Sequence, residues 1–329
     1  MNLALDAMGG DHAPAEIVAG AVQAAPFING TISLVGIPAQ IQAHLPTPAP
    51  PQINIVPASE VVTMDDKPTE ALRKKKDSSI AVSIELVKAG VADAVVSAGN
   101  TGAVTAASLI GWRQMKGIHR PAIAAVFPHR HGHFLLLDAG ASPDIDPSNL
   151  VEFGLLGRIY AEHVMGIKDP RVHLLNIGEE EGKGNAFAKH AYHVLSQRDW
   201  FKGNIEGKDM FRGETDVVLC DAFVGNIVLK SAEGIAEFMM GSIRDALPTG
   251  TLARLPYLPL RSLLAPLRKK TDYTEYGGMP LLGLNGLTFI CHGRSNSKAI
   301  KNALLYAQRA VDANLLEKMR ESVSSSLST

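Results

Sequence analysis

Short apolar runs recur along the chain and alternate with longer segments in which apolar residues return every three or four positions. Runs that are almost fully apolar are typical of strands buried on both faces of a sheet. Because helical segments separate most of them, the pattern predicts βαβ units and a mainly parallel sheet covered by helices. The predicted strands are Leu3–Leu5, Ile32–Val35, Ile53–Val56, Ala94–Val96, Ile123–Phe127, Phe134–Leu137, Val172–Leu175, Val217–Leu219 and Leu287–Ile290. The predicted helices are Pro14–Ala25, Ser79–Lys88, Thr101–Trp112, Leu150–Val164, Ala186–Gln197, Ile227–Met240 and Lys298–Ala313.

One stretch departs from this alternation. In AIAAVFPHRHGHFLLLDA two apolar runs are joined by a short polar turn that contains glycine, which predicts a β-hairpin. The sheet is therefore expected to be mixed, although mostly parallel, and flanked by helices in an α/β/α arrangement. A chain of 329 residues can form one large domain or two smaller ones, and we expect a single domain over residues 1–329.

The segment at residues 245–276 has a different pattern and is expected to be an amphipathic helical excursion from that domain. Within Leu252–Lys270, arginines recur every seven residues and three prolines prevent one long straight helix, so two short helices at a tip are expected. The leucines spaced as on one helix face are Leu260, Leu263, Leu264 and Leu267. Two interpretations stay open, a helix packed on a partner subunit or the core, and a helix lying in a membrane interface.

Composition excludes several classes of protein. A formal net charge of -1 and 5% aromatic residues argue against a nucleic-acid-binding surface. The two cysteines, Cys220 and Cys291, have neither the number nor the spacing of a disulfide framework or a zinc site, which fits a reducing compartment. The N-terminus has no signal or transit pattern, and no apolar run is long enough to span a bilayer. We expect a cytoplasmic protein whose membrane contact, if any, is peripheral.

Three predicted strands end in an aspartate that is followed by a turn into a helix. Asp6 precedes Gly9, Gly10 and Asp11, Asp138 precedes Gly140, and Asp221 precedes Gly225 and Asn226. Ligands of open α/β sheets bind outside the carboxyl ends of the strands, so the three turns are expected to converge on one site. The alternative for each aspartate alone is that it only caps its helix or fixes its turn.

A fourth strand end reads SAGNTGA, where Ser97 is followed by Gly99, Asn100, Thr101 and Gly102. Glycines let backbone N–H groups approach a ligand, and the following helix offers its positive N-terminus, so this turn suits a phosphate or an oxyanion. Glycine-asparagine turns also occur where only a positive φ is required. Neither a GxxxxGK[ST] P-loop nor a GxGxxG fingerprint is present, which removes the usual support for nucleotide binding.

Basic residues near these turns are candidates for binding an anion: Lys67, Arg73 to Lys76, Lys183, Lys230 and Arg294. Most exposed lysines and arginines are merely solvated, and Lys183, between two glycines, is the strongest candidate. His292 ends a strand and is a candidate acid, base or phosphate donor, or else a hydrogen-bonded turn histidine.

Nucleophilic catalysis has little support, because neither serine nor cysteine lies in a GxSxG turn and Cys220 ends a buried strand. The spacing of His129, His131 and His133 is compatible with a metal site, but a polar hairpin turn is the simpler interpretation.

Several motifs in order from Leu3 to about Ala313 resemble those of the bacterial phosphate acyltransferase family of phospholipid synthesis. They are LALDAMGGD, LRKKKDSS, SAGNTGA, LLLDAGA, LLNIGEEEGKGN, DVVLCDAFVGNIVLKSAEG, LLGLNG and the closing HG. Two positions depart from the family pattern, since Ser142 replaces an asparagine and Ala222 replaces a glycine. The His-rich hairpin is not a motif of that family.

The resemblance implies transfer of a fatty acyl group from acyl-carrier protein to inorganic phosphate, without a cofactor or a metal, and feeding a membrane glycerol-3-phosphate acyltransferase. It also implies a homodimer and a fold related to isocitrate and isopropylmalate dehydrogenases and to phosphotransacetylases. Phosphate is itself a nucleophile, so the missing triad is expected. The aspartates would orient turns rather than touch phosphate, because like charges repel. A membrane role for residues 245–276 gains support, because the product is passed to a membrane enzyme, and this role places the protein at the inner face of the membrane.

Within this interpretation the expected catalytic residues are Lys183, His292, Asn226 and Asp221. The expected substrate-binding residues are Asp6, Gly9, Gly10, Asp11, Lys67, Arg73, Ser97, Gly99, Asn100, Thr101, Gly102, Asp138, Gly140 and Gly225. Leu260, Leu263, Leu264 and Leu267 are the expected membrane contacts. Two alternatives remain, a metal-dependent oxidative decarboxylase of the related fold and a non-catalytic acyl-carrier or lipid-surface adaptor.

Overall fold

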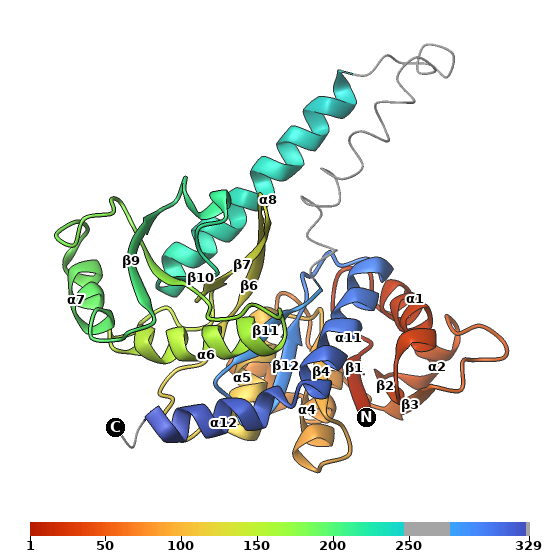
Figure 1. Ribbon diagram of the computed structural model, residues 1–329. Helices are drawn as coiled ribbons and strands as arrows, with labels where there is room; N and C mark the ends of the chain where they lie inside the picture. The colour runs from red at the N-terminus through yellow and green to blue at the C-terminus, as the bar shows by residue number, and fades with distance from the viewer. Residues whose placement is uncertain (247–276, 327–329) are drawn as a thin grey trace.

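Two β-sheets with helices packed against them form the structure, a computed structural model that describes residues 1–246 and 277–326 (Figure 1). The seven-stranded sheet has the order β3 (Ile53–Pro57), β2 (Thr31–Gly36), β1 (Asn2–Asp6), β4 (Ala94–Ser97), β12 (Leu287–Ile290), β11 (Met279–Leu282) and β5 (Ala122–Ile123). Its first five strands are parallel, whereas β11 is antiparallel to both of its neighbours. The five-stranded sheet has the order β6 (Ala125–His129), β7 (Gly132–Leu137), β10 (Val217–Leu219), β8 (Val172–Asn176) and β9 (Phe201–Glu206).

In the five-stranded sheet β7, β10, β8 and β9 are parallel, and β6 pairs with β7 as an antiparallel hairpin. The prediction of a mixed, mostly parallel α/β arrangement is therefore confirmed, and so is the hairpin. The helices are α1 (Ala15–Ala24), α2 (Pro38–Gln42), α3 (Pro68–Lys74), α4 (Ser79–Lys88), α5 (Thr101–Trp112), α6 (Asn149–His163), α7 (Ala186–Leu195), α8 (Ala222–Asp245), α11 (Ser297–Asp312) and α12 (Leu315–Ser326).

Helices cover both faces of the seven-stranded sheet because side chains alternate along each strand. Leu3 and Leu5 of β1 belong to the apolar cluster that includes α1 and α11, while Ala4 belongs to the cluster that includes α4 and α5. The five-stranded sheet divides in the same way, with Leu135 in the first cluster and Leu136 in the second. The two sheets therefore share their apolar cores. The assignment of residues 1–329 to one domain stays a prediction.

The predicted strand Ile123–Phe127 is wrong in one respect, because the chain changes sheets within it. β5 ends at Ile123 and β6 begins at Ala125, and the Ala124 amide between them donates to the Pro280 carbonyl of β11 at 3.0 Å. One apolar run thus serves both sheets. An uninterrupted apolar sequence contains no signal for such a crossing.

Other elements were missed or mispredicted in length. β9 was missed because its sequence, FKGNIE, alternates imperfectly and half of it is polar, and α8 begins at Ala222 rather than at Ile227. Among the described helices none is long and apolar enough to cross a membrane. Of the predicted excursion at 245–276, only Asp245 and Ala246 belong to the described residues. Its four leucines lie outside them.

Candidate active site

Three turns lie side by side at the carboxyl edge of the seven-stranded sheet, because β1, β4 and β12 are adjacent and parallel. The turn after β1 is bonded to the turn after β12, where the Asp11 amide donates to the Gly293 carbonyl at 2.8 Å. The turn after β12 is bonded to β4, where the Cys291 amide donates to the Ser97 carbonyl at 2.8 Å. The three turns form one hydrogen-bonded unit, which we call the first turn cluster.

Asp6 lies at the base of this cluster and is fully buried. Its carboxylate accepts hydrogen bonds from the Ser97 hydroxyl at 2.6 Å and from the Met8 amide at 3.2 Å, and burial raises the pKa of this carboxyl while those bonds oppose the rise. Ser97 in turn accepts from the Gly99 amide at 3.1 Å. Asp6 therefore joins two turns from inside the protein and has no surface open to a ligand.

Two glycines let the turns approach one another. A Cβ on Gly9 would lie 2.5 Å from an Asp6 carboxylate oxygen and 2.7 Å from the Gly99 nitrogen. Gly10 has a φ of 106°, which side chains disfavour, and a Cβ there would lie 3.0 Å from the Gly293 carbonyl oxygen. At these two positions only glycine allows the cluster to close.

The N-terminus of α5 opens toward solvent beside these turns. Asn100 caps it, since its side-chain oxygen accepts from the Ala103 amide at 3.1 Å, and its amide group donates to the Met64 carbonyl at 2.9 Å. The next two residues, Thr101 and Gly102, are exposed, and within the described parts of the chain their amides have no recorded acceptor. A helix start with open amides is a ready anion-binding position.

His292 lies in the turn after β12 and extends toward α8. Its Nδ1 accepts from the Arg294 amide at 3.1 Å, so the neutral ring carries its proton on Nε2, which lies 3.7 Å from a Glu233 carboxylate oxygen. Glu233 also binds Lys230 on the same helix, at 2.9 Å and 3.1 Å. α8 thereby places the Glu233 carboxylate and the Lys230 ammonium group near the imidazole.

Burial lowers the pKa of His292 below its usual 6.5, and the nearby Lys230 charge lowers it further while Glu233 opposes this. The ring is therefore neutral near pH 7. Protonation of Nδ1 would replace this acceptor with an N–H donor that faces the Arg294 N–H group, and the bond would be lost. The neutral tautomer with a proton on Nε2 is the form that this turn is built to hold.

The other predicted turns form a second cluster, on the five-stranded sheet. Asp138, which follows β7, is fully buried, and its carboxylate accepts from four backbone amides at 2.8–3.0 Å. The donors are Ile123, Gly140, Ala141 and Ser142. Burial raises the pKa of this carboxyl, whereas the four amides favour its ionised form. Asp138 therefore shapes a turn and is shielded from any ligand.

α8 begins against that turn. Asp221 caps the helix by accepting from the Val224 amide at 2.9 Å. Gly225 is buried, and a Cβ there would lie 1.9 Å from the Asp138 carbonyl oxygen, so the helix touches the neighbouring turn. Asn226 is exposed and faces Gly140, where a Cβ would lie 3.8 Å from the asparagine side-chain oxygen.

Asp6 and Asp138 lie at the edges of different sheets, so the strand-end turns form two clusters, and their convergence on one site stays a prediction. α8 is the connection between the two clusters. From Asn226 to Glu233 the helix rises about 10 Å, at 1.5 Å per residue. A substrate that contacts both clusters must therefore be extended along the first turns of α8.

Three predicted basic residues lie at the margins. Lys183 is exposed in the loop between β8 and α7, at the carboxyl edge of the five-stranded sheet, and its carbonyl accepts from the Asn176 side chain at 3.2 Å. Lys67 precedes α3 and pairs with Glu70 at 3.7 Å, and Pro68 beside it packs on Gly102. Arg73 is exposed on α3. Neither Lys183 nor Arg73 touches a turn of the first cluster in the described structure.

The cysteines are unsuited to nucleophilic attack. Both are buried, and burial raises the pKa of Cys220 well above its usual value and that of Cys291 to about 12. A thiol in this state is a small apolar residue and not a thiolate.

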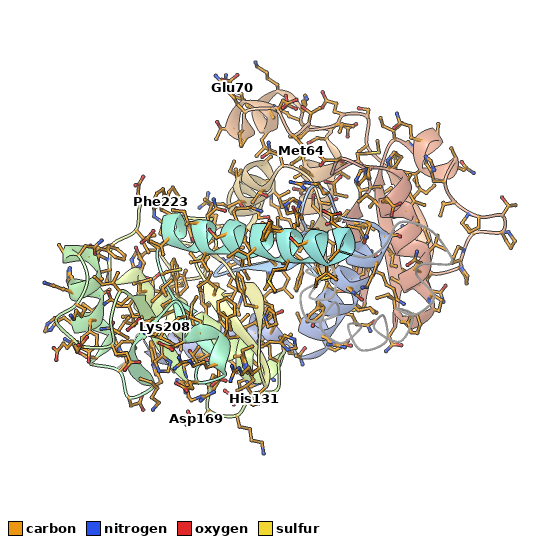
Figure 2. All side chains as sticks on the ribbon, turned by 90° about the horizontal axis from the view of Figure 1, so that it is seen from above. Met64, Glu70, His131, Asp169, Lys208 and Phe223 are labelled. Carbon is orange, nitrogen blue, oxygen red and sulfur yellow. The ribbon has the colours of Figure 1, made fainter. Side chains whose placement is uncertain are left out.

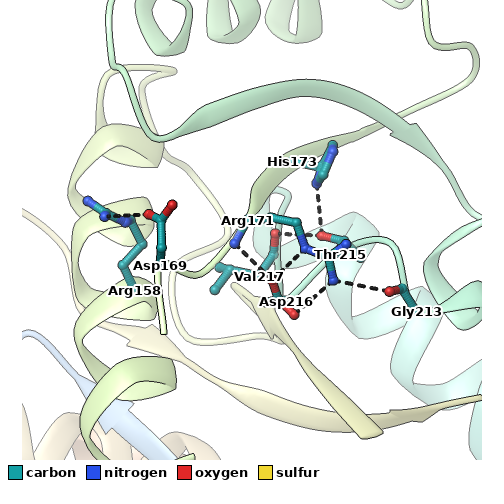
Figure 3. Close-up of polar contacts among 8 residues, drawn as sticks. All are labelled: Arg158, Asp169, Arg171, His173, Gly213, Thr215, Asp216 and Val217. Carbon is teal, nitrogen blue, oxygen red and sulfur yellow. Dashed lines mark hydrogen bonds and ion pairs between the residues drawn. The ribbon is translucent and has the colours of Figure 1, made fainter. Parts of the chain in front are cut away.

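The histidines of the hairpin lie at the opposite, amino end of the five-stranded sheet. Figure 3 shows the amino end of this sheet, where the Arg171 guanidinium donates two hydrogen bonds to Asp216 at 2.8 Å and 3.1 Å and His173 lies 3.0 Å from the Thr215 hydroxyl. Burial lowers the pKa of His173 to about 4. Across the described residues no group of three or more potential ligands is arranged to hold a metal ion. Within the hairpin turn the His131 amide donates to the His129 ring at 3.1 Å.

Sequence reasoning missed Glu233 and did not connect Lys230 with His292. Glu233 and His292 are 59 positions apart and lie on different elements, so no local motif joins them. Sequence reasoning also did not distinguish Lys75, which makes contacts inside the protein, from the exposed basic residues on either side of it. Lys75 binds Asp66 at 2.5 Å and the Val61 carbonyl at 2.8 Å, and so holds the loop that carries Met64 against Asn100.

Comparison with known proteins adds three findings. The profile of a family described as fatty acid synthesis protein matches residues 1–318. A phosphate acyltransferase of Heliobacterium modesticaldum is 51% identical over 98% of both chains, and one of Geobacter sulfurreducens is 46% identical over 97% of this chain and 94% of its own. Among solved structures, a phosphotransacetylase from Streptococcus pyogenes has a TM-score of 0.60 at 15% identity, covering 95% and 94%. A branched-chain phosphotransacylase from Enterococcus faecalis has a TM-score of 0.61 at 15% identity, covering 94% and 99%.

Proposed function

This chain belongs to the phosphate acyltransferase family, and from that premise we propose that it transfers a fatty acyl group from acyl-carrier protein to inorganic phosphate. The products are acyl phosphate and free carrier protein. Acyl phosphate would then feed acylation of glycerol 3-phosphate by a membrane enzyme. The single observation within the structure that carries this assignment is the first turn cluster, in which open backbone amides, a neutral histidine and a buried scaffold meet, while its cysteine, Cys291, is buried with a raised pKa.

We place phosphate at the N-terminus of α5. Thr101 and Gly102 are exposed there, their amides make no backbone hydrogen bond to the described residues, and the helix dipole favours a dianion. Asp6 is buried beneath the turn, so its charge is not presented to the ligand. Lys67, beside the Pro68 contact to Gly102, lies on the same corner and would add a positive charge.

The reaction needs no covalent enzyme intermediate. A phosphate oxygen attacks the thioester carbonyl carbon, the carbonyl oxygen becomes an oxyanion, and collapse of that intermediate expels the carrier thiolate, which takes up a proton. His292 would donate its Nε2 proton in a hydrogen bond to the oxyanion, with the Arg294 amide on Nδ1 fixing the ring. Removal of one such donor typically costs about a hundredfold or more in kcat.

The acyl chain is placed along α8 toward the second turn cluster, where Gly225 and Asn226 lie. Asn226 and Lys183 would then contact the acyl thioester from the other sheet. With this placement one extended substrate would contact both clusters, since Asn226 and Glu233 are separated by a helical rise of about 10 Å.

The activity is tested by incubating the protein with acyl-carrier thioester and phosphate and trapping acyl phosphate with hydroxylamine as a hydroxamate. We expect phosphate-dependent hydroxamate, reduced about a hundredfold in His292→Asn, which keeps an acceptor for the Arg294 amide but lacks the Nε2 donor. The double variant Lys183→Ala/Asn226→Ala tests the second cluster. No hydroxamate above the background of these variants would defeat the proposal and return attention to the decarboxylase or adaptor alternatives.

A homodimer is also proposed, through α8. Several of its apolar side chains are exposed, and Figure 1 shows its far half projecting beyond both sheets. Phe223, Ile227, Ile235 and Phe238 have exposed fractions of 69%, 49%, 59% and 74%. Large exposed apolar surfaces usually mark an interface. Sedimentation of Ile235→Glu/Phe238→Glu should show a monomer where the wild type is a dimer, and equal mass for both would reject this interface.

Peripheral association with the inner face of the membrane is proposed for residues 245–276, on the sequence pattern of Leu260, Leu263, Leu264 and Leu267. Co-sedimentation with liposomes should be lost in Leu260→Glu/Leu264→Glu. Equal binding by the variant and the wild type would reject this role.

A further inference from the structure

Exposed basic residues lie along α3, at its junction with α4 and at the end of α4, and we call this set the basic surface. Its members are Lys67, Arg73, Lys74, Lys76 and Lys88, all exposed. Between Lys67 and Lys88 the chain carries six basic and three acidic residues, although the formal charge of the whole protein is -1. The positive charge is thus local, and it can attract an acidic partner to one face of a nearly neutral protein.

The lysines of this region differ in what they contact. Lys75 is turned inward onto Asp66 and the Val61 carbonyl, and its bond to Asp66 lowers the pKa of that carboxyl. Lys67 and Lys74 share Glu70, at 3.7 Å and 3.5 Å. Arg73 and Lys76 have no ion-pair partner among the residues that the structure describes. Their charges remain available to another molecule.

The basic surface borders the proposed phosphate position through a short series of contacts. Lys75 holds the loop that precedes α3, and the Met64 and Asp66 carbonyls of that loop accept from Asn100 at 2.9 Å and 3.2 Å. Met64 reaches across to the turn after β12, where its methyl carbon lies 3.0 Å from the position of a Cβ on Gly293. In Figure 2, Met64 and Glu70 lie on one side of α8, and His131, Asp169 and Lys208 lie on the other.

A shallow hollow of about 400 Å³ lies along the outer face of α4, next to Lys76. Its lining combines apolar and charged residues: Lys76, Ala81, Val82, Glu85, Leu86 and Ala89. The apolar side chains are recessed here, with Val82 and Leu86 partly buried, whereas a lipid-binding surface presents protruding apolar residues. A recessed apolar strip beside basic side chains suits an amphipathic element of an acidic protein.

We propose that the basic surface and this hollow dock the acidic carrier protein that brings the acyl thioester. The inference rests on the proposed function and adds to it the face from which the protein substrate approaches. Carboxylates of the carrier pair with Arg73, Lys74 and Lys76, and its thioester arm passes Met64 toward the start of α5. Phosphate and the small reacting part of the thioester do not contact Lys74 or Lys76.

The test compares Lys74→Glu/Lys76→Glu with Lys168→Glu/Lys202→Glu, which changes the net charge equally at exposed lysines of the five-stranded-sheet half. Each is assayed with acyl-carrier protein and with a small neutral acyl thioester of N-acetylcysteamine. In the first variant we expect KM for the carrier substrate to rise about tenfold or more, with kcat and the activity on the small thioester unchanged. The second variant should match the wild type, and added salt should raise the wild-type KM for the carrier alone.

An unchanged carrier KM in Lys74→Glu/Lys76→Glu, with normal activity on the small thioester, would overturn the docking surface and leave the acyltransferase intact. Loss of binding to phosphatidylglycerol vesicles with an unchanged carrier KM would overturn it in favour of a membrane contact. Absence of acyl phosphate from both substrates in the wild type would instead defeat the proposed function itself.

Discussion

Gly225 is the position at which the contact between α8 and the Asp138 turn can be tested most sharply. A methyl group at Gly225 would lie 1.9 Å from the Asp138 carbonyl oxygen and 3.0 Å from the Cys220 sulfur. The first of these atoms is backbone, held by strand pairing and by the amides around Asp138, and it cannot turn aside as a flexible side chain would. Gly225→Ala therefore has to displace the start of α8.

The magnitude follows from two opposing effects. Overpacking of a closed contact costs about 3 kcal/mol or more in the free energy of unfolding. Alanine in a helix recovers about 1 kcal/mol of intrinsic preference relative to glycine. We therefore expect Gly225→Ala to destabilise the protein by about 2 kcal/mol. Gly234 lies on the same helix with no atom within 4 Å of its Cβ position, so Gly234→Ala should stabilise by about 0.5–1 kcal/mol.

Denaturant unfolding followed by circular dichroism measures the free energy of unfolding of both variants. We expect Gly225→Ala below and Gly234→Ala above the wild type, with about 3 kcal/mol between them. Acyl phosphate formation should fall in Gly225→Ala and not in Gly234→Ala, because the first shifts Asn226 and the helix that carries Glu233. Equal stability of the two variants would refute the contact and, with it, the account of how α8 connects the clusters.

Three further predictions concern the first turn cluster and the thiols. The acid limb of the pH–rate profile should have a midpoint below 6.5, because the pKa of His292 is lowered. This midpoint should move to higher pH in Lys230→Met and to lower pH in Glu233→Gln, since Lys230 lowers the pKa of His292 and Glu233 raises it. Shifts of the same sign in both variants would contradict this. Cys220→Ala and Cys291→Ala should each keep kcat within about threefold, because burial holds both thiols protonated, and complete loss of turnover would reject the assignment. Asn100→Ala should lower stability by about 1 kcal/mol through the lost cap and raise KM for phosphate, whereas loss of stability alone would remove α5 from the phosphate site.

Much of this fold is predictable from local patterns. Most buried strands of both sheets are short apolar runs whose neighbours have a helical period, and nine such runs identified strands that the structure contains, although the buried strand β11, Met279–Leu282, was missed. β9 was not predictable, because an edge strand such as Phe201–Glu206 is only half buried and needs no apolar run. The crossing at Ala124 depends on pairing with Pro280, which is far along the chain.

The site was predictable in its parts and not in its arrangement. Glycine-rich strand ends identified Gly9, Gly10 and the Asn100 turn, because close backbone approach requires those residues. Which turns share an edge is decided by strand order, and the sequence alone does not distinguish one sheet from two. The contact of Glu233 with His292 depends on where a long helix crosses a distant turn, so it is visible only in three dimensions.

The central claim is that phosphate attacks the thioester directly, without an acyl-enzyme. Rapid mixing of the protein with an equal amount of acyl-carrier thioester, with and without phosphate, followed by measurement of released thiol and of the intact protein mass, tests it most directly. The account predicts no thiol release and no mass increase without phosphate, and stoichiometric thiol and acyl phosphate once phosphate is present. One equivalent of thiol released without phosphate, together with a protein heavier by one acyl group, would contradict it.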